Sequence, residues 1–309
     1  MNYAPVALFV YKRPDHLQQT LEHLKKNEGA KETSLYIFSE GPKADASVSD
    51  HEAIKAVRQI IHDISGFKEV IIQEAQSNIG CADSIVAGIT HVLTKHESII
   101  ILEDDIITHP LFLKFCNCGL EQFKDDEKVM QIGTFMFPTE TTLPLSFLSR
   151  KVFCWGWATW KRAWKELDRD TNAHSTKLKN HNLIYDFDLK GVYPYFKSLE
   201  AQSSGDIDAW DICWYATIFL KQGLSLYPSF PLSQNIGLDG SGTHFRSDTG
   251  TKIPPFQVDE NILSSIPSAI QLDEKGETVI NLAVANWSKL SSIETIKVKI
   301  NNLINKLRK

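Results

Sequence analysis

The sequence predicts an α/β fold, in which a mostly parallel sheet is flanked by helices and followed by a C-terminal helical tail. Over the first 135 residues, short apolar runs alternate with helical patterns. This alternation is typical of right-handed β-α-β units with parallel strands. In addition, three acidic residues directly follow the branched apolar run at 98–102, as expected where a buried parallel strand ends.

The alternating patterns divide the first half of the chain into expected strands and helices. The candidate N-caps are Asp15, Asp50 and Ser77, because their side chains can accept from the free N–H groups of a first helical turn. The expected strands are Val6–Tyr11, Ser34–Ser39, Glu69–Gln73, Ser98–Leu102 and Val129–Gly133. The expected helices are Asp15–Lys26, Asp50–Ile64, Cys81–Thr94 and Pro110–Phe123.

The regular alternation ends after residue 135. The aromatic block that follows contains Trp157, Trp160 and Trp164 at helical spacing, which indicates a core face. We expect Trp160 and Trp164 to lie in the core and Gly156 and Trp157 to contact substrate. The other expectations are a loop at 136–150, a mostly irregular region at 168–206, a helix at Ala209–Gln222 ended by Gly223, a strand at Leu224–Tyr227 and a glycine-rich loop at 235–244.

The bulk composition excludes several classes of protein. The chain has 309 residues, of which 42% are hydrophobic and 23% charged, as in ordinary soluble globular proteins. Its formal charge of -5 argues against general nucleic-acid binding. No apolar stretch approaches the roughly 18–20 residues that span a bilayer, and no signal-peptide pattern follows Met1. Five scattered cysteines predict a reducing, cytoplasmic location.

The acidic triplet Glu103-Asp104-Asp105 is the first candidate functional feature. In open α/β sheets, ligands bind at the C-terminal ends of the strands, where the strand order switches. Three carboxylates placed there repel one another, and a divalent cation relieves the repulsion. Carboxylate oxygens are hard ligands that suit Mg²⁺ or Mn²⁺. The alternative is an acidic, solvated turn between a strand and a helix.

Polar residues also follow the first two expected strands. Tyr11, Lys12 and Arg13 follow the first strand, and Glu40 follows the second. Because the ends of parallel strands meet at one edge, these groups are expected to be neighbours in space. Arg13 is then a candidate contact for phosphate or ribose, and Glu40 a candidate acceptor for a base N–H. The alternative is a set of solvated loop charges.

Four short motifs together resemble the GT-A-fold glycosyltransferases, in particular the broad family 2 enzymes. The acidic triplet and a later Trp-Asp pair at 210–211 are most similar to the inverting N-acetylglucosaminyltransferase I group. The similarity covers about residues 5–245. The four motifs are Leu8–Tyr11 with Arg13, Ser-Glu-Gly-Pro at 39–42, Asn-Ile-Gly at 78–80 and Leu-Glu-Asp-Asp at 102–105.

This resemblance implies roles for individual residues at the donor side. Asp105, the last acid of the triplet, corresponds to the residue that binds the metal ion, which in turn binds the donor diphosphate. Glu103, the first acid, corresponds to a ribose contact. The other donor-binding residues that the resemblance implies are Tyr11, Arg13, Glu40, Asn78 and Asp104.

Later motifs correspond to the sugar and to the chemical step. Gly156 and Trp157 match a segment that flanks the donor sugar, and Asp211 matches the general base. His244 matches a loop residue that reaches the metal or diphosphate, with Arg246 as a weaker diphosphate candidate. Two departures are visible: the acidic motif begins with Glu and not Asp, and no Gln-x-x-Arg-Trp motif is present, so chain polymerisation is not expected.

Asp211 also has a purely structural interpretation. With Asp208 as the N-cap, Asp211 would be the third helical residue, which is a capping arrangement. Inverting sugar transfer needs a carboxylate that takes a proton from the acceptor hydroxyl. The Trp-Asp resemblance favours Asp211 for this role, and Asp206 and Asp208 are its rivals.

The function expected from these features is a cytoplasmic glycosyltransferase that depends on Mn²⁺ or Mg²⁺. It would move a sugar from a UDP-sugar to a glycan or lipid-linked acceptor with inversion, through a catalytic domain at 1–255 followed by an extension at 256–309. One alternative is a sugar-nucleotide pyrophosphorylase, although the first loop, Tyr-Lys-Arg-Pro-Asp, is not glycine-rich. The other is a non-catalytic glycan-binding or scaffold protein.

The last residues form a basic amphipathic pattern. Six basic residues against Glu294 give this segment a charge of six minus one, or +5. Residues 287–309 are therefore expected either to contact an anionic membrane surface or to pack on the catalytic domain or a second subunit as a homodimer. The apolar stripe is Leu290, Ile293, Ile296, Ile300, Leu303 and Leu307, and the basic residues are Lys289, Lys297, Lys299, Lys306, Arg308 and Lys309.

Overall fold

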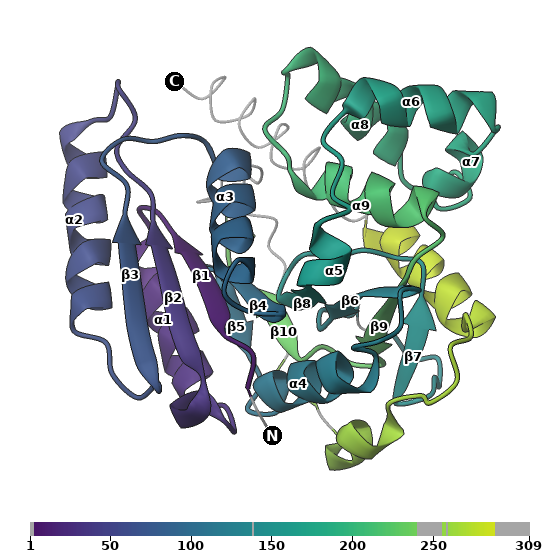
Figure 1. Ribbon diagram of the computed structural model, residues 1–309, viewed down its shortest axis with the longest axis horizontal. Coiled ribbons are helices and arrows are strands. Elements are labelled where there is room, and N and C mark those ends of the chain that lie inside the picture. Colours follow the sequence, from purple (N-terminus) through teal and green to yellow (C-terminus); the bar gives the residue numbers. More distant parts are fainter. Residues whose placement is uncertain (1–2, 138, 240–254, 258, 288–309) are drawn as a thin grey trace, which may run out of the picture.

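The computed structural model describes residues 3–137, 139–239, 255–257 and 259–287 (Figure 1). His244, Arg246 and the basic stripe at 288–309 lie outside these residues, so their expected roles stay predictions. Within the described ranges, no helix combines the length and the apolar character that crossing a bilayer requires.

The core of the molecule is an eight-stranded mixed sheet in the order β3-β2-β1-β4-β8-β6-β9-β7, which confirms the predicted fold class. The first four strands in this order are parallel, and β8 is antiparallel to both β4 and β6. The bounds are β1 Val6–Val10, β2 Ser34–Ser39, β3 Glu69–Glu74, β4 Ser98–Glu103, β6 Val129–Gly133, β7 Ser146–Ser149, β8 Trp157–Trp160 and β9 Leu224–Pro228. A second, two-stranded sheet pairs β5 (Ile106–Thr108) with β10 (Ser233–Asn235).

The strand order creates a switch point between β1 and β4. The chain runs outward from β1 through β2 to β3 and then returns to place β4 on the other side of β1. Because such crossovers are right-handed, α1 and α2 cover one face and α3 covers the opposite face, as Figure 1 shows. The first four helices are α1 Pro14–Lys25, α2 Val48–His62, α3 Cys81–Leu93 and α4 Phe112–Gln122.

The helix starts differ from the predicted N-caps. Ser47 caps α2, and Asp50 is the third residue of a capping box in which the Asp50 N–H donates to Ser47 Oγ over 3.2 Å. α1 begins directly at Pro14, whose fixed φ suits a first helical position, so Asp15 lies in the first turn. α3 begins after Gly80, whose φ of 94° is favourable only for glycine, and not after Ser77.

The second half of the chain is more regular than its sequence predicts. Residues 168–206 contain three helices, and the expected loop at 136–150 contains β7. Trp157 to Trp160 form a strand and not a helix, because β8 lies between β4 and β6 and is buried on both faces. Figure 1 shows α6 to α9 grouped beside the sheet. The helices are α5 Lys161–Trp164, α6 Thr171–Asn180, α7 Ile184–Phe187, α8 Tyr195–Ser204 and α9 Asp211–Leu220.

α9 spans Asp211–Leu220, so it is two residues shorter at each end than the predicted helix Ala209–Gln222. The left-handed residue is Gln222, with φ 53°. Its N–H donates to the Phe219 carbonyl and the Gly223 N–H donates to the Ile218 carbonyl, which is the bonding of a Schellman motif. A Cβ on Gly223 would lie 2.6 Å from the Met130 sulfur, so Gly223 serves the packing between α9 and β6.

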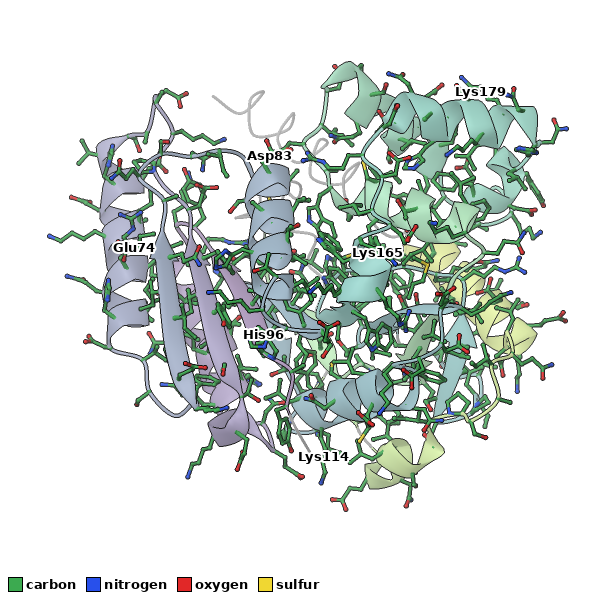
Figure 2. The ribbon with its side chains drawn as sticks, viewed as in Figure 1. Glu74, Asp83, His96, Lys114, Lys165 and Lys179 are labelled. Carbon is green, nitrogen blue, oxygen red and sulfur yellow. The ribbon has the colours of Figure 1, made fainter. Side chains whose placement is uncertain are left out.

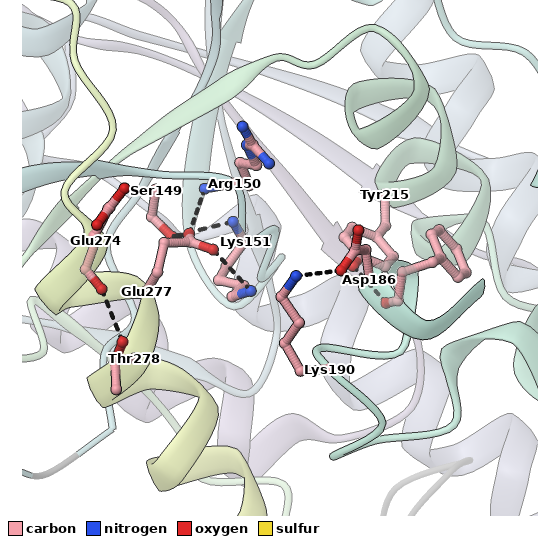
Figure 3. Close-up of polar contacts among 10 residues, drawn as sticks. Ser149, Arg150, Lys151, Asp186, Lys190, Tyr215, Glu274, Glu277 and Thr278 are labelled. Atoms are coloured by element: carbon pink, nitrogen blue, oxygen red, sulfur yellow. Dashed lines mark hydrogen bonds and ion pairs between the residues drawn. The ribbon is translucent and has the colours of Figure 1, made fainter. Parts of the chain in front are cut away.

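A helical segment at 274–287 packs on β7, inside the expected extension. Val279, Ile280 and Val284 on this segment are buried in the main core. Glu277 fixes the segment, since its carboxylate accepts from Ser149 Oγ at 2.6 Å and the Arg150 N–H at 2.7 Å and pairs with Lys151 Nζ at 3.0 Å (Figure 3). A domain boundary near residue 255 stays a prediction, but residues 274–284 share the core of the sheet.

We expect Glu277→Ala to lower the free energy of unfolding by about 2–4 kcal/mol, because it leaves the buried Lys151 ammonium unpaired. The Lys151 side chain is only 7% exposed and that of Glu277 only 18%. Denaturant unfolding measures the change. Glu274→Ala is the matched control on the same segment and is expected to change stability by less than about 0.5 kcal/mol. Equal effects of the two variants would contradict the role of Glu277 in fixing this segment.

Candidate functional site

The residues that follow β1 and β4 meet at the switch point of the sheet. Arg13, directly after β1, pairs through Nη2 with Asp104 and through Nη1 with Asp105 Oδ2, the latter at 2.8 Å. The side chains of Asp104 and Asp105 are only 4% and 11% exposed. The alternative of an acidic, solvated turn is therefore wrong, and Arg13 binds protein carboxylates where the sequence suggested a contact to phosphate or ribose.

Asp104 links the two strand ends. Its Oδ2 accepts from the Tyr11 N–H at 3.3 Å, and its main-chain carbonyl accepts from Thr20 Oγ1 at 2.9 Å. With Arg13 on Oδ1, the carboxylate is occupied by protein donors. Asp104 was expected among the donor-binding residues, but in this structure its contacts fix the β1–α1 loop against the end of β4.

The triplet carries more negative charge than Arg13 neutralises. Burial, followed by the charges of Asp105, Asp104 and Asp211, raises the pKa of Glu103 to about 8 against the opposing effect of Arg13. Burial likewise raises the pKa of Asp104 to about 6 in spite of its pairing with Arg13. The site therefore favours a proton or another positive charge near Glu103.

Asp211 is brought to the triplet from far along the chain. It is the first residue of α9, with Trp210 as the N-cap residue. Its Oδ1 accepts from the Ile212 N–H at 3.0 Å, and its charge acts on Glu103. The tertiary structure thus adds a fourth carboxylate, far from the triplet in sequence, at the same edge of the sheet.

The capping interpretation of Asp211 is wrong in its detail. Asp208 does not cap α9; its Oδ2 lies 3.4 Å from the Ala82 N–H at the start of α3. That contact joins the α6–α9 group to the sheet, because α3 packs on β1 and β4. A carboxylate near the first N–H groups of a helix is favoured by the helix dipole, which accounts for the position of Asp208.

Glu40 directly follows the end of β2. The residue is 7% exposed, and its Oε1 accepts from the Gly41 N–H at 2.9 Å. Among the described residues, its Oε2 has no hydrogen-bond partner although the atom is buried. Because a buried carboxylate oxygen without a donor is costly, Glu40 is the residue at this edge that most needs a ligand donor.

Asn78 organises the loop opposite Glu40. Its Nδ2 donates to the Gly41 carbonyl at 3.2 Å, and its Oδ1 accepts from the Gly80 N–H at 3.1 Å. A Cβ on Gly41 would lie 2.6 Å from the backbone of Ser77, so the two loops touch directly. Asn78 therefore fixes the backbone beside Glu40, and its expected role in donor binding stays a prediction.

Gly156 and Trp157 lie deeper than their expected contact with substrate requires. The Gly156 carbonyl accepts from Thr134 Oγ1 at 2.6 Å, and at φ 79° a Cβ would lie 2.8 Å from Ser233 Cβ. Trp157 is completely buried, so it does not contact substrate in this structure and the expectation is wrong for that residue. Trp160 and Trp164 are only 3% and 5% exposed, so both lie in the core, as predicted.

Trp157 instead supports the start of α9. Its ring stacks on Trp210 at 5.4 Å and 22°, and it also contacts Trp164 and Trp214. Trp210 directly precedes Asp211, so this cluster fixes the position of the candidate base. The sequence signal was the density of tryptophans, which by itself does not distinguish a packing role from a binding role.

The glycine-rich loop begins against the triplet. The Ile236 N–H donates to the Asp105 carbonyl at 2.8 Å, and a Cβ on Gly237 would overlap the Asp105 carboxylate. Gly237 is therefore a site residue that the sequence did not single out, although the predicted loop contains it. His244 and Arg246 follow in the sequence and lie outside the described residues.

Several further residues near Asp211 belong to none of the sequence motifs described above. Cys81, the first residue of α3, is exposed at the surface. The protein atoms around its thiol desolvate it and, together with the charges of four nearby acids, raise its pKa. Burial and Asp211 also raise the pKa of Cys154. Neither cysteine is activated as a nucleophile, because activation requires a lowered pKa. The charge of Asp211 also acts on Tyr193 and Tyr195.

The donor set of the triplet fits a divalent cation that shares its ligands with a bound phosphate. Within the described residues, no group of three His, Cys, Asp or Glu side chains converges as a complete metal site. Mg²⁺ in nucleotide enzymes typically takes one or two carboxylates together with substrate phosphates and water. Asp105 with its neighbour Glu103 supplies ligands of that number and chemistry.

Comparison with known proteins identifies no family from sequence, because no family model and no curated protein match the chain. Residues 1–349 of TarS from S. aureus match with 10% identity and a TM-score of 0.41, covering 76% of this chain and 61% of that one. The mannosyltransferase PcManGT from Pyrobaculum calidifontis, in complex with GDP-Man and Mn²⁺, matches with 10% identity and a TM-score of 0.35, covering 71% and 75%.

A longer TarS structure matches with 10% identity and a TM-score of 0.36, covering 53% of this chain and 30% of that one. The chain thus spans less than two thirds of the TarS chains that it matches. TM-scores below 0.5 at such low identity carry no argument about function. None of these structures is named as a member of the N-acetylglucosaminyltransferase I group, so that finer resemblance stays a prediction.

We expect Glu103→Gln to change how stability depends on pH. Because the pKa of Glu103 is raised from 4.5 to about 8 in the folded protein, the folded state binds more protons than the unfolded state between these values. Wild-type stability therefore falls as pH rises through this window. Between pH 5 and 9, the free energy of unfolding of the variant should fall by about 1–3 kcal/mol less than that of wild type, after allowance for solvent screening.

Thermal unfolding in EDTA-containing buffers across this range measures the difference. Glu97→Gln, at a carboxylate whose side chain is 87% exposed just before β4, is the matched control and should follow the wild-type curve. Parallel curves for wild type and Glu103→Gln would contradict the raised pKa.

Proposed function

We propose that this protein is a metal-dependent glycosyltransferase that moves a sugar from a nucleotide-sugar to a saccharide acceptor. The observation that carries the proposal is the convergence of Asp211 with the Glu103–Asp105 triplet at the switch point of the sheet. The triplet suits the binding of a cation and a diphosphate. Asp211 suits the removal of a proton from an acceptor hydroxyl. Fold alone would not support this conclusion, because one fold supports many functions.

The nucleoside pocket is assigned to Tyr11, Glu40 and Asn78. The buried Oε2 of Glu40 has no donor among the described residues, and a base with a ring N–H supplies one. Uracil and guanine carry such an N–H, whereas adenine and cytosine do not in their usual forms. We infer a UDP-sugar as the preferred donor, since the sequence resemblance points to the same class.

The diphosphate side is assigned to Asp105, with Glu103 beside it. A Mn²⁺ or Mg²⁺ ion bound there would supply positive charge to the departing diphosphate. Arg13 keeps Asp104 and Asp105 in place and neutralises part of their charge. His244 and Arg246 are proposed as further contacts from the loop that begins at Gly237.

Asp211 is assigned the role of general base. One of its oxygens is oriented by the Ile212 N–H, and the tryptophan cluster fixes the helix start that carries it. The carboxylate accepts the proton of the acceptor hydroxyl, and the hydroxyl oxygen forms the new bond to the anomeric carbon as the bond to the diphosphate breaks. Attack from the face opposite the leaving group gives inversion.

Two other functions make different predictions. A sugar-nucleotide pyrophosphorylase is disfavoured because the loop after β1 is occupied by the pairing of Arg13 with Asp104 and is not glycine-rich. A non-catalytic scaffold predicts no metal-dependent nucleotide binding. A membrane or homodimer contact through residues 287–309 stays a prediction.

We expect Asp105→Asn to abolish Mn²⁺-dependent binding of UDP while the fold survives, because the metal loses its anionic ligand. Isothermal titration calorimetry with UDP, with and without Mn²⁺, measures the effect. Asp125→Asn, at an exposed acid after α4, is the control and should bind as wild type. Unchanged UDP affinity in Asp105→Asn would overturn the metal assignment.

We expect Asp211→Asn to lower turnover by about 10²–10⁴ while UDP affinity stays unchanged, because only the base is lost. Steady-state kinetics together with calorimetry separate the two effects. Asp208→Asn is the matched control, since it weakens the contact with α3 but should retain most turnover per folded molecule. If Asp208→Asn and not Asp211→Asn removes turnover, the assignment of the base is wrong.

A further inference from the structure

A stack of aromatic side chains leads from α9 to the protein surface. Tyr215 lies one turn after Asp211, so the two residues share a face of the helix. The Tyr215 ring packs on Phe187 at 4.6 Å and on Tyr195 at 4.9 Å. Tyr195 packs in turn on Tyr193 at 4.6 Å. The stack therefore connects the helix of the proposed base to Tyr193.

The outer end of this stack is exposed and its inner end is rigid. Phe187 and Tyr215 are 0% and 4% exposed, whereas Tyr193 is 36% exposed. The Tyr215 hydroxyl also donates to the Phe187 carbonyl at 2.7 Å, which fixes the inner rings. Tyr193 thus offers an aromatic surface to solvent on an ordered support.

The backbone before Tyr193 adopts an unfavourable conformation. Leu189, Lys190 and Gly191 have φ values of 55°, 64° and 78° in succession. Non-glycine residues in this region cost free energy and persist only where the surrounding structure imposes them, often at functional sites. Here Asp188 imposes it, since its carbonyl accepts from the Tyr193 N–H and its Oδ1 accepts from the Phe196 N–H at 2.7 Å.

Tyr193 lies within electrostatic reach of Asp211. Burial and then the Asp211 charge raise the pKa of Tyr193, and the same carboxylate acts on Tyr195. The exposed Tyr185 on α7 is different, because its ring contacts Lys190 at 5.8 Å. Of these two exposed tyrosines in the helical group, Tyr193 is therefore the candidate for contact with a molecule bound at the proposed base.

We propose that Tyr193 is a stacking platform for a sugar ring of the acceptor. The inference rests on the proposed function, because Asp211 must receive a hydroxyl proton from a molecule that lies beside Tyr193. The charge of Asp211, which acts on Tyr193, disfavours an anionic acceptor group at this position by repulsion. A neutral saccharide ring matches the site, with an apolar C–H face for the aromatic ring and hydroxyls for the carboxylate.

The test measures saccharide binding separately from turnover. Four probes are used: methyl β-glucoside, methyl β-galactoside, methyl N-acetyl-β-glucosaminide and methyl α-rhamnoside. Saturation-transfer NMR titrations are run on the full chain with saturating UDP and Mg²⁺, because paramagnetic Mn²⁺ would broaden the probe signals. We expect wild type to bind at least one probe and Tyr193→Ala to bind that probe about three- to tenfold more weakly, the range for loss of one aromatic contact.

Three variants provide the controls. Tyr193→Phe and Tyr193→Trp retain a ring and should bind the probe within about twofold of wild type, which separates stacking from loss of fold. Tyr185→Ala removes a more exposed tyrosine, 63% against 36%, and should not change binding.

The proposal is overturned if Tyr193→Ala binds as wild type, if Tyr193→Phe loses as much affinity as Tyr193→Ala, or if UDP binds but no probe does. Absence of Mn²⁺-dependent UDP binding in wild type would overturn the proposed function instead. Probe binding that still depends on the Tyr193 ring in that case would support the platform alone.

Discussion

The pairing of Arg13 with Asp104 and Asp105 is the interaction on which the candidate site depends. It joins the residues after β1 and β4, the two neighbouring strands between which the chain reverses its direction of travel across the sheet. Without a cation, adjacent buried carboxylates would repel one another and favour their protonated forms. Arg13 neutralises part of this charge, and Tyr11 and Thr20 add donors that fix Asp104.

The remaining charge gives the site its chemical character. Glu103 has a pKa raised to about 8, so the protein favours added positive charge at this position. Under the proposed function, a divalent cation with a bound diphosphate would meet that need, and Asp105 and Glu103 would supply carboxylate ligands to it. Stability and ligand binding would then be coupled through the same carboxylates.

A second set of contacts fixes Asp211 relative to the triplet. Trp157 on β8 stacks on Trp210, and β8 pairs directly with β4, the strand that ends in the triplet. The candidate base and the candidate metal ligand are thus positioned by adjacent strands of one sheet. Asp208 adds a contact to the start of α3. The dense tryptophan packing therefore supports the candidate base through geometry, although Trp157 has no exposed surface.

The sequence by itself determined the parallel half of the sheet, because buried strands and amphipathic helices leave local patterns of apolar residues. It also placed Arg13, Glu40 and the triplet at strand ends, since that position depends only on where each strand stops. Only the tertiary structure decided that Arg13 binds the acids, that Trp157 to Trp160 form a central strand, and that Asp208 contacts α3. It also decided that the charge of Asp211 acts on Glu103. Those outcomes depend on contacts between residues far apart in the chain, and such contacts leave no periodic pattern in the sequence.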